Sequence, residues 1–103
     1  MRAQISLRLP PDCWLFIQEM RSVATSLPLT GDVDAILSLP PQIELRMPIP
    51  EPRFIVRMTR PQLAVLHRWL HALVHRLSAE HYRRRTCLEC ISRVAGALRL
   101  SEP

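Results

Sequence analysis

The chain opens with a two-residue alternation of polar and apolar positions and then changes to a helical repeat. Residues 4–9 alternate strictly, which places their apolar side chains on one face of a predicted strand. A pair of prolines ends the alternation, and Asp12 is suited to cap a helix over about residues 12–24. The apolar stripe of that helix consists of Cys13, Phe16, Ile17, Met20 and Ala24.

The middle of the chain has a weaker pattern. Within residues 25–42 a Thr-Gly-Asp turn offers Asp32 as a cap, and the apolar residues after it predict either a short helix or a loop. Alternation returns at residues 43–47 and again at 54–58, with prolines between the two runs. The two runs predict strands that form a hairpin.

A long helix is predicted over residues 60–79. Thr59 and Gln62 form a capping-box pattern with a proline in the first turn, and leucines recur three and four residues apart. A second apolar surface lies on the opposite side of this helix and consists of Val65, Trp69 and Ala72. Such a helix is either sandwiched within the fold or shared with a partner subunit.

The last segment, residues 83–99, predicts an amphipathic helix with Cys87, Ile91, Val94 and Leu98 on its apolar face. Together the elements predict a single α+β domain over residues 1–103. A small, mainly antiparallel sheet, made of the N-terminal strand and the hairpin, packs against two long C-terminal helices and one N-terminal helix.

The charged residues are biased toward arginine. All 14 basic residues are arginine, none is lysine, and the formal net charge is +5. The basic surplus is C-terminal, because residues 61–103 hold seven arginines and three acids. No signal peptide or membrane-spanning run is visible, and three cysteines do not form a secreted disulfide framework. We therefore expect a cytoplasmic protein with reduced thiols and no membrane association.

The stretch HYRRRTCLEC, residues 81–90, contains a C-x-x-C pair. Packing as small buried hydrophobes explains Cys87 and Cys90 without further chemistry. A zinc site would need two more ligands, such as Cys13 or His81, and a redox pair would use the arginines to lower the Cys87 pKa. The sequence predicts the packing role, with no cofactor and no metal site.

Three histidines, His67, His71 and His75, recur every four residues on the long helix. Neighbouring pairs lie within reach of a shared metal ion. Because their row runs beside the leucine stripe, a partly solvated border of the helix is the simpler interpretation.

Basic side chains also gather around the turn before the last helix. Arg76, Arg83, Arg84 and Arg85, with His81 and Tyr82, surround the start of that helix, whose free backbone N–H groups attract anions. A phosphate, a nucleic-acid backbone or an acidic protein patch fits this site, and so does a solvated turn without a ligand.

The run QISLRLPPD, with the helix after it, resembles the opening strand of ribbon-helix-helix DNA-binding proteins. The resemblance implies that outward residues of a paired strand contact bases in the major groove, and here these are Gln4, Ser6 and Arg8. It covers about twenty residues, and the later hairpin and two helices have no counterpart in that family.

The leading functional hypothesis is a non-catalytic protein-interaction module: an adaptor, assembly factor or inhibitor, acting as a homodimer or within a heteromeric complex. No glycine-rich phosphate loop or nucleophile elbow indicates an enzyme. The alternatives are a small nucleic-acid-binding regulator and a metal- or redox-responsive protein. The residues expected to bind a partner, with an acidic surface favoured, are Val65, Trp69, Ala72, Arg76, His81, Tyr82, Arg83, Arg84 and Arg85.

Overall fold

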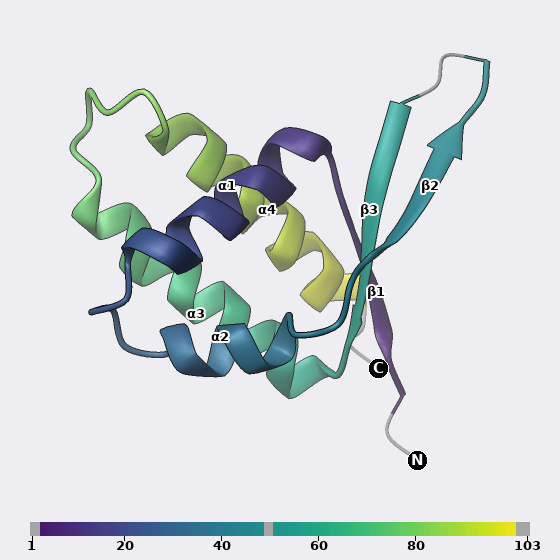
Figure 1. Ribbon diagram of the computed structural model, residues 1–103, viewed down its shortest axis with the longest axis horizontal. Coiled ribbons are helices and arrows are strands. Elements are labelled where there is room, and N and C mark those ends of the chain that lie inside the picture. Colours follow the sequence, from purple (N-terminus) through teal and green to yellow (C-terminus); the bar gives the residue numbers. More distant parts are fainter. Residues whose placement is uncertain (1–2, 49–50, 101–103) are drawn as a thin grey trace.

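The computed structural model describes residues 3–48 and 51–100 and confirms the predicted α+β class (Figure 1). Three strands and four helices follow one another in the expected order. Their bounds are β1 Ile5–Leu9, α1 Pro11–Val23, α2 Thr30–Ile36, β2 Gln42–Arg46, β3 Glu51–Met58, α3 Arg60–Arg76 and α4 Arg84–Leu100. The segment left open between loop and short helix therefore contains the short helix α2.

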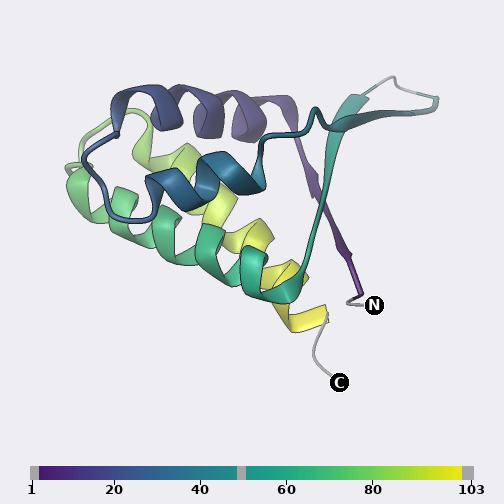
Figure 2. The same ribbon diagram turned by 60° about the horizontal axis from the view of Figure 1, so that its bottom comes forward.

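The sheet is antiparallel, with the strand order β1-β3-β2. Leu7 lies opposite Val56, and Ile43 lies opposite Phe54, so most apolar side chains of the three strands face the same side, whereas Ile55, opposite Arg8 and Gln42, faces the other. The helices cover that side of β1 and of the C-terminal half of β3, whereas the β2–β3 hairpin extends beyond them (Figure 2).

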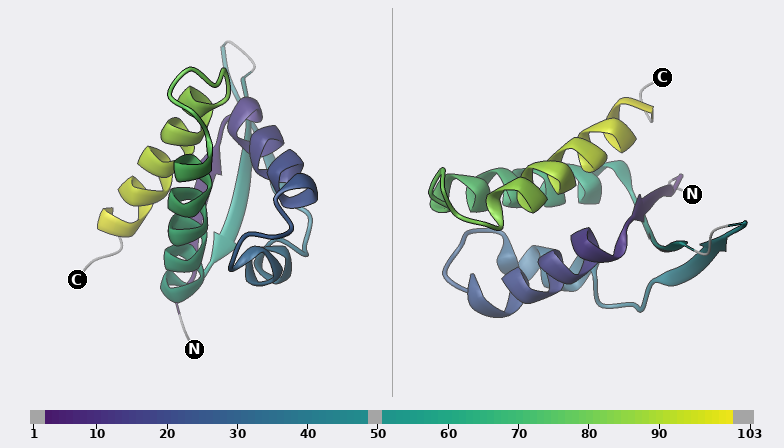
Figure 3. Two further views of the ribbon diagram at one scale, coloured as in Figure 1. Left: turned by 90° about the vertical axis from the view of Figure 1, so that its left-hand side faces the viewer. Right: turned by 90° about the horizontal axis from the view of Figure 1, so that it is seen from above.

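The helices form two pairs against the sheet. In Figure 3 the α3–α4 pair lies on one side and the α1–α2 pair on the other, and buried side chains from every helix fill the space between them. The leucine stripe of α3 is buried here, including Leu63, Leu66, Leu70 and Leu73. One core therefore joins the N-terminal and C-terminal parts of the chain.

Trp69, from the predicted second apolar surface of α3, is buried together with the leucines and not on the opposite side of the helix, and α2 packs against α3. Trp69 is 0% exposed, and its Nε1–H donates to Thr30 Oγ1 at 3.0 Å. The Thr30 hydroxyl in turn shares its proton between the carbonyl oxygens of Ala24 and Leu27, at 2.9 and 3.0 Å. Val65 and Ala72 pack partly buried against the core. Trp69 is therefore sandwiched within the fold and offers no surface to a partner, whereas Val65 and Ala72 keep part of their surface exposed.

The predicted N-terminal cap is confirmed for α3 and is wrong for α1 and α2. At α3 the capping box is present: the backbone N–H of Thr59 donates to Gln62 Oε1 at 2.9 Å, and Gln62 N–H donates to Thr59 Oγ1 at 3.4 Å. The predicted caps Asp12 and Asp32 are wrong, because both lie in the first turn of their helices. In the first turn a carboxylate still interacts favourably with the positive end of the helix dipole. The N-cap positions are Pro10 and Leu29.

Candidate interaction surface

The three cysteines lie inside the helical layer and are free. Each is 0% exposed. The Cys87 thiol donates to the carbonyl oxygen of Leu70 at 3.7 Å, and the Cys90 thiol donates to that of Cys13 at 3.8 Å. Burial raises the pKa of Cys87 to about 11, against a smaller opposing effect of Arg84. Contact with the Cys13 side chain, followed by burial, raises the pKa of Cys90. Protonated, enclosed thiols fit the predicted packing role.

A metal-binding arrangement around the C-x-x-C motif is not assembled. Within the described residues, the group that brings three potential ligand atoms within 4.8 Å of one another is Asp12, Cys13 and Glu89. It includes neither cysteine of the motif and no histidine. The two carboxylates lie at the surface, and Glu89 already pairs with Arg93 at 3.2 Å.

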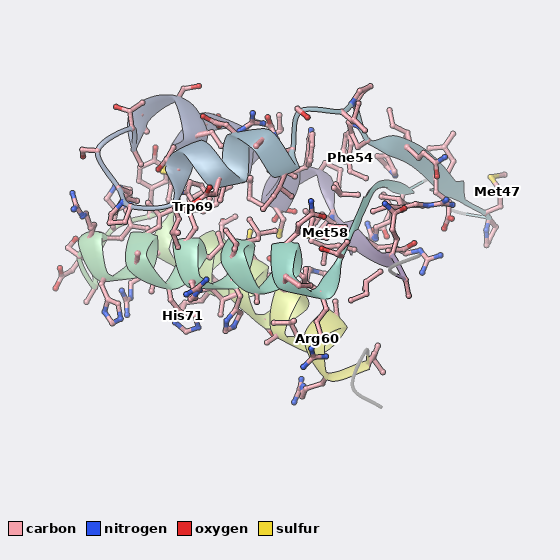
Figure 4. All side chains as sticks on the ribbon, turned by 90° about the horizontal axis from the view of Figure 1, so that it is seen from below. Met47, Phe54, Met58, Arg60, Trp69 and His71 are labelled. Carbon is pink, nitrogen blue, oxygen red and sulfur yellow. The ribbon has the colours of Figure 1, made fainter. Side chains whose placement is uncertain are left out.

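The histidine row lies along the border of α3. His71 is on the side of the helix that faces away from Trp69 and α2 (Figure 4). The His67 and His71 rings meet edge to face, with centroids 4.5 Å apart. Partial burial, and then the neighbouring His71, lower the pKa of His67. His75 is exposed one turn further on.

The three consecutive arginines of the turn before α4 point to different places. Arg83 forms an ion pair with Glu19 of α1 and lies 5.6 Å from the centre of the Tyr82 ring. Arg84 donates from Nη1 to the carbonyl oxygens of Val74 and Leu77, at 2.9 and 3.3 Å, where α3 ends.

The remaining residues of the predicted arginine site are more open. Arg85 and Arg76 are exposed, and so is Tyr82, whose ring stacks on His81 with centroids 5.0 Å apart. Two of the three arginines thus hold α1 and α3 in place. The turn does not form a single anion clamp.

The largest exposed apolar feature of the sheet was not predicted as a site. Ile43, Leu45 and Met47, which we call the hairpin apolar face, are 64%, 63% and 78% exposed. Ile43 is the register partner of Phe54, whose ring stacks on Trp14 of α1 at 5.5 Å. Figure 4 shows Phe54 near the helices and Met47 far from them, at the end of the hairpin. The apolar side of β2 therefore continues the core-facing side of the sheet past the last helix.

The outward side of the sheet is mainly polar, with Ile55 between Arg8 and Gln42. Gln4, Ser6 and Arg8 are exposed there, as the resemblance to ribbon-helix-helix proteins implies, and Ser6 lies opposite the exposed Arg57. The resemblance does not extend to the fold, because β1 pairs with β3 of its own chain.

Beside β1 the surface is hollowed by a groove of about 520 Å³. It runs between residues 4–8 and α4, where Arg93, Gly96, Ala97 and Leu100 line it. Because both outward and inward residues of β1 line the groove, it follows the edge of the strand rather than one face.

Comparisons of this chain with family models, with curated proteins and with solved structures find no match. Among the described helices, none combines the length and the apolar character that crossing a bilayer requires.

Proposed function

We propose that this protein is a non-catalytic interaction module that docks on a protein partner through the hairpin apolar face. The observation that carries the proposal is the exposure of Ile43 and Leu45 on one side of the edge strand β2, and of Met47 in the turn that follows it. Isolated exposed leucines are common, but a row of large apolar side chains on a projecting hairpin is typical of an interface.

The energetics support a docking role. Covering one aliphatic side chain of this size contributes about 1.5–3 kcal/mol. Trp69, which the sequence suggested for this purpose, is already covered by α2, so that its apolar surface stabilises the chain itself. A cytoplasmic setting is part of the proposal, supported by the three free thiols.

Paired substitutions test the proposal. Leu45→Asp places a charge within the hairpin apolar face, and Leu15→Asp places the same charge on α1 at a residue of similar exposure, 58% against 63%. Tagged wild-type and variant proteins are purified from their own cells, and the accompanying proteins are compared by mass spectrometry. We expect a defined partner to be lost with Leu45→Asp and kept with Leu15→Asp. Equal recovery with both variants would contradict the proposal.

A second candidate function, nucleic-acid binding, is favoured by the outward side of the sheet, where Arg8 and Arg57 are exposed beside Gln4 and Ser6. Arginine contacts to phosphates make binding fall steeply with salt. We expect the double substitution Arg8→Gln, Arg57→Gln to weaken binding to duplex DNA and to reduce its salt dependence. Unchanged binding of that variant would exclude this surface.

A further inference from the structure

The unpaired edge of β2 has the properties of a strand-pairing site. Within residues 3–48 and 51–100, β2 is at one end of the three-stranded sheet and pairs with β3 on one side only. At the other end of the sheet, α4 packs against β1 and lines the groove along its edge. An edge strand with a free row of N–H and C=O groups is a template for another strand.

Pro52 determines which backbone groups of β2 are free. Leu45 lies opposite Pro52 in the β2–β3 register. In a hydrogen-bonded antiparallel pair the two residues exchange both bonds, and proline has no N–H to donate. Leu45 is therefore at a non-bonded position, and its own N–H and C=O point toward the free edge. By alternation the same holds for Ile43, whereas the backbone groups of Glu44 point toward β3.

The sequence of β2 is complementary to itself in one register. If two copies pair around a two-fold axis at Leu45, that residue meets Leu45 of the second copy, and Ile43 faces Met47, the first residue after β2. The Leu45 pair uses the free backbone groups of both copies and lies on the helix-facing side of the sheet. Glu44 then occupies the register position opposite Arg46 of the second copy, so residues of opposite charge are paired.

The neighbouring registers are disfavoured. An axis at Glu44 sets two glutamates against each other, and an axis at residue 46 sets two arginines against each other. An axis at Ile43 brings Pro41 opposite Leu45 at a position that needs a backbone donor. Charge complementarity therefore singles out the axis at Leu45. Glu44 already lies 4.0 Å from Arg8, so the second copy would add to an existing group of charges.

We propose that β2 pairs antiparallel with β2 of a second copy of this chain, with the two-fold axis at Leu45, to form a six-stranded sheet across a homodimer. This inference rests on the proposed function, because it names a second copy as the partner that covers the hairpin apolar face. Pairing brings Ile43, Leu45 and Met47 of both copies together on the side that carries the helices.

Charge reversal tests the register. Glu44→Arg and Arg46→Glu each replace two attractive pairs by two repulsive ones, so each variant should dimerise about tenfold or more weakly than the wild type. An equimolar mixture of the two variants restores both pairs and should form a heterodimer. Mass is measured by light scattering and by sedimentation equilibrium across a wide concentration range, and thermal melting of each variant checks its fold. The proposed register would be overturned if either variant alone dimerised as strongly as the wild type. It would also be overturned if the equimolar mixture remained monomeric.

A proline substitution tests the edge. Leu45→Pro removes a donor at the free edge and none of the donors to β3, so the variant should fold and remain monomeric. Glu44→Pro, the matched control, removes a donor to β3 and should lower the melting temperature. A folded Leu45→Pro dimer of wild-type affinity would refute pairing through this edge.

The outcomes also separate this inference from the proposed function. A wild-type protein that is monomeric at every concentration refutes the homodimer. If the wild type is monomeric but co-purifies with a different protein that Leu45→Asp fails to bind, the docking proposal is kept, with that protein as the partner. If Leu45→Asp has no effect on either the dimer or any complex, both proposals fall.

Discussion

Thr30 is a buried polar residue whose hydroxyl group takes part in three hydrogen bonds. Its hydroxyl accepts from the Trp69 indole and donates to the chain just before α2. The same side chain therefore satisfies a buried donor and fixes the path by which α2 reaches α3. Sequence reasoning placed a turn here, but neither residue type nor spacing indicated which distant side chain the threonine would meet.

Replacing Thr30 tests that role. Thr30→Val keeps the shape and removes the acceptor, which leaves the buried Trp69 N–H without its partner. We expect the free energy of unfolding to fall by about 1–3 kcal/mol, measured by urea denaturation. Thr25→Val, at an exposed threonine in the same connection, should change it by less than about 0.5 kcal/mol. A similar effect of both substitutions would show that the hydrogen bond contributes little.

The buried thiols predict how stability responds to alkali. The pKa of Cys87 is raised by burial to about 11 from an ordinary value of 9.0. The unfolded chain therefore loses this proton at lower pH than the folded chain does. The resulting stability is fully present below pH 9 and is lost as the pH rises toward 11. Urea denaturation of the wild type and of Cys87→Ala across this range measures the effect, and the variant should show the shallower decline.

Native-state alkylation provides an independent check on the thiols. All three cysteines should react slowly in the folded protein and rapidly in urea, because the enclosed thiols are out of reach of the reagent in the folded state. Fast labelling of Cys87 or Cys90 in the native protein would mean that the packing role is wrong.

At the scale of elements, Arg84 joins two helices. Its guanidinium donates to the last carbonyl oxygens of α3 from the first residue of α4. This interaction complements the negative end of the α3 dipole and adds a donor at the Val74 carbonyl oxygen, which also accepts from the Leu77 N–H at 3.2 Å. A residue predicted to bind a ligand is thus used to end one helix and begin another.

Removing that guanidinium should loosen the connection between α3 and α4. Arg84→Met keeps most of the aliphatic stem and loses the charged donor, which should cost about 1.5–3 kcal/mol of stability. Arg85→Met is the matched control at an exposed neighbour and should leave the melting temperature nearly unchanged. If the two variants melt together, Arg84 does not act as a cap.

The strongly patterned elements could be predicted from the sequence. The capping box at Thr59 gave the start of α3, and alternation gave all three strands. Local signals could not give the position of β3 between β1 and β2, because strand order depends on contacts between distant residues. That order decides that Ile43 and Leu45 lie on an edge, so the candidate docking face could not be predicted without it.

For the turn that contains Arg83, Arg84 and Arg85, local signals were also insufficient, because they did not show which distant groups the arginines contact. Its residues come close together, as predicted, but Glu19 and the end of α3 occupy Arg83 and Arg84. Both partners come from other elements, and nothing in the spacing of three consecutive arginines indicates them. Clustering in sequence therefore overestimated the charge available to a ligand.

At the scale of the whole molecule, the hairpin divides the protein into a helical body and a projecting sheet. The two parts should differ in amide hydrogen exchange. In a monomer the amide of Glu44 should be protected by β3, whereas those of Ile43 and Leu45 should exchange rapidly at the free edge. Assembly should protect Ile43 and Leu45 as well. Equal protection of all three amides in a verified monomer would contradict the assignment of the free backbone groups.

The two tryptophans sit in different parts of this architecture. Trp69 is enclosed between α2 and α3, and Trp14 stacks on Phe54 where α1 meets the sheet. Each indole therefore has its own optical environment, so that Trp14→Phe and Trp69→Phe leave one fluorophore apiece. The protein carries two native fluorescent probes, of which one follows the closure of the helical body and the other follows the seating of the hairpin on α1.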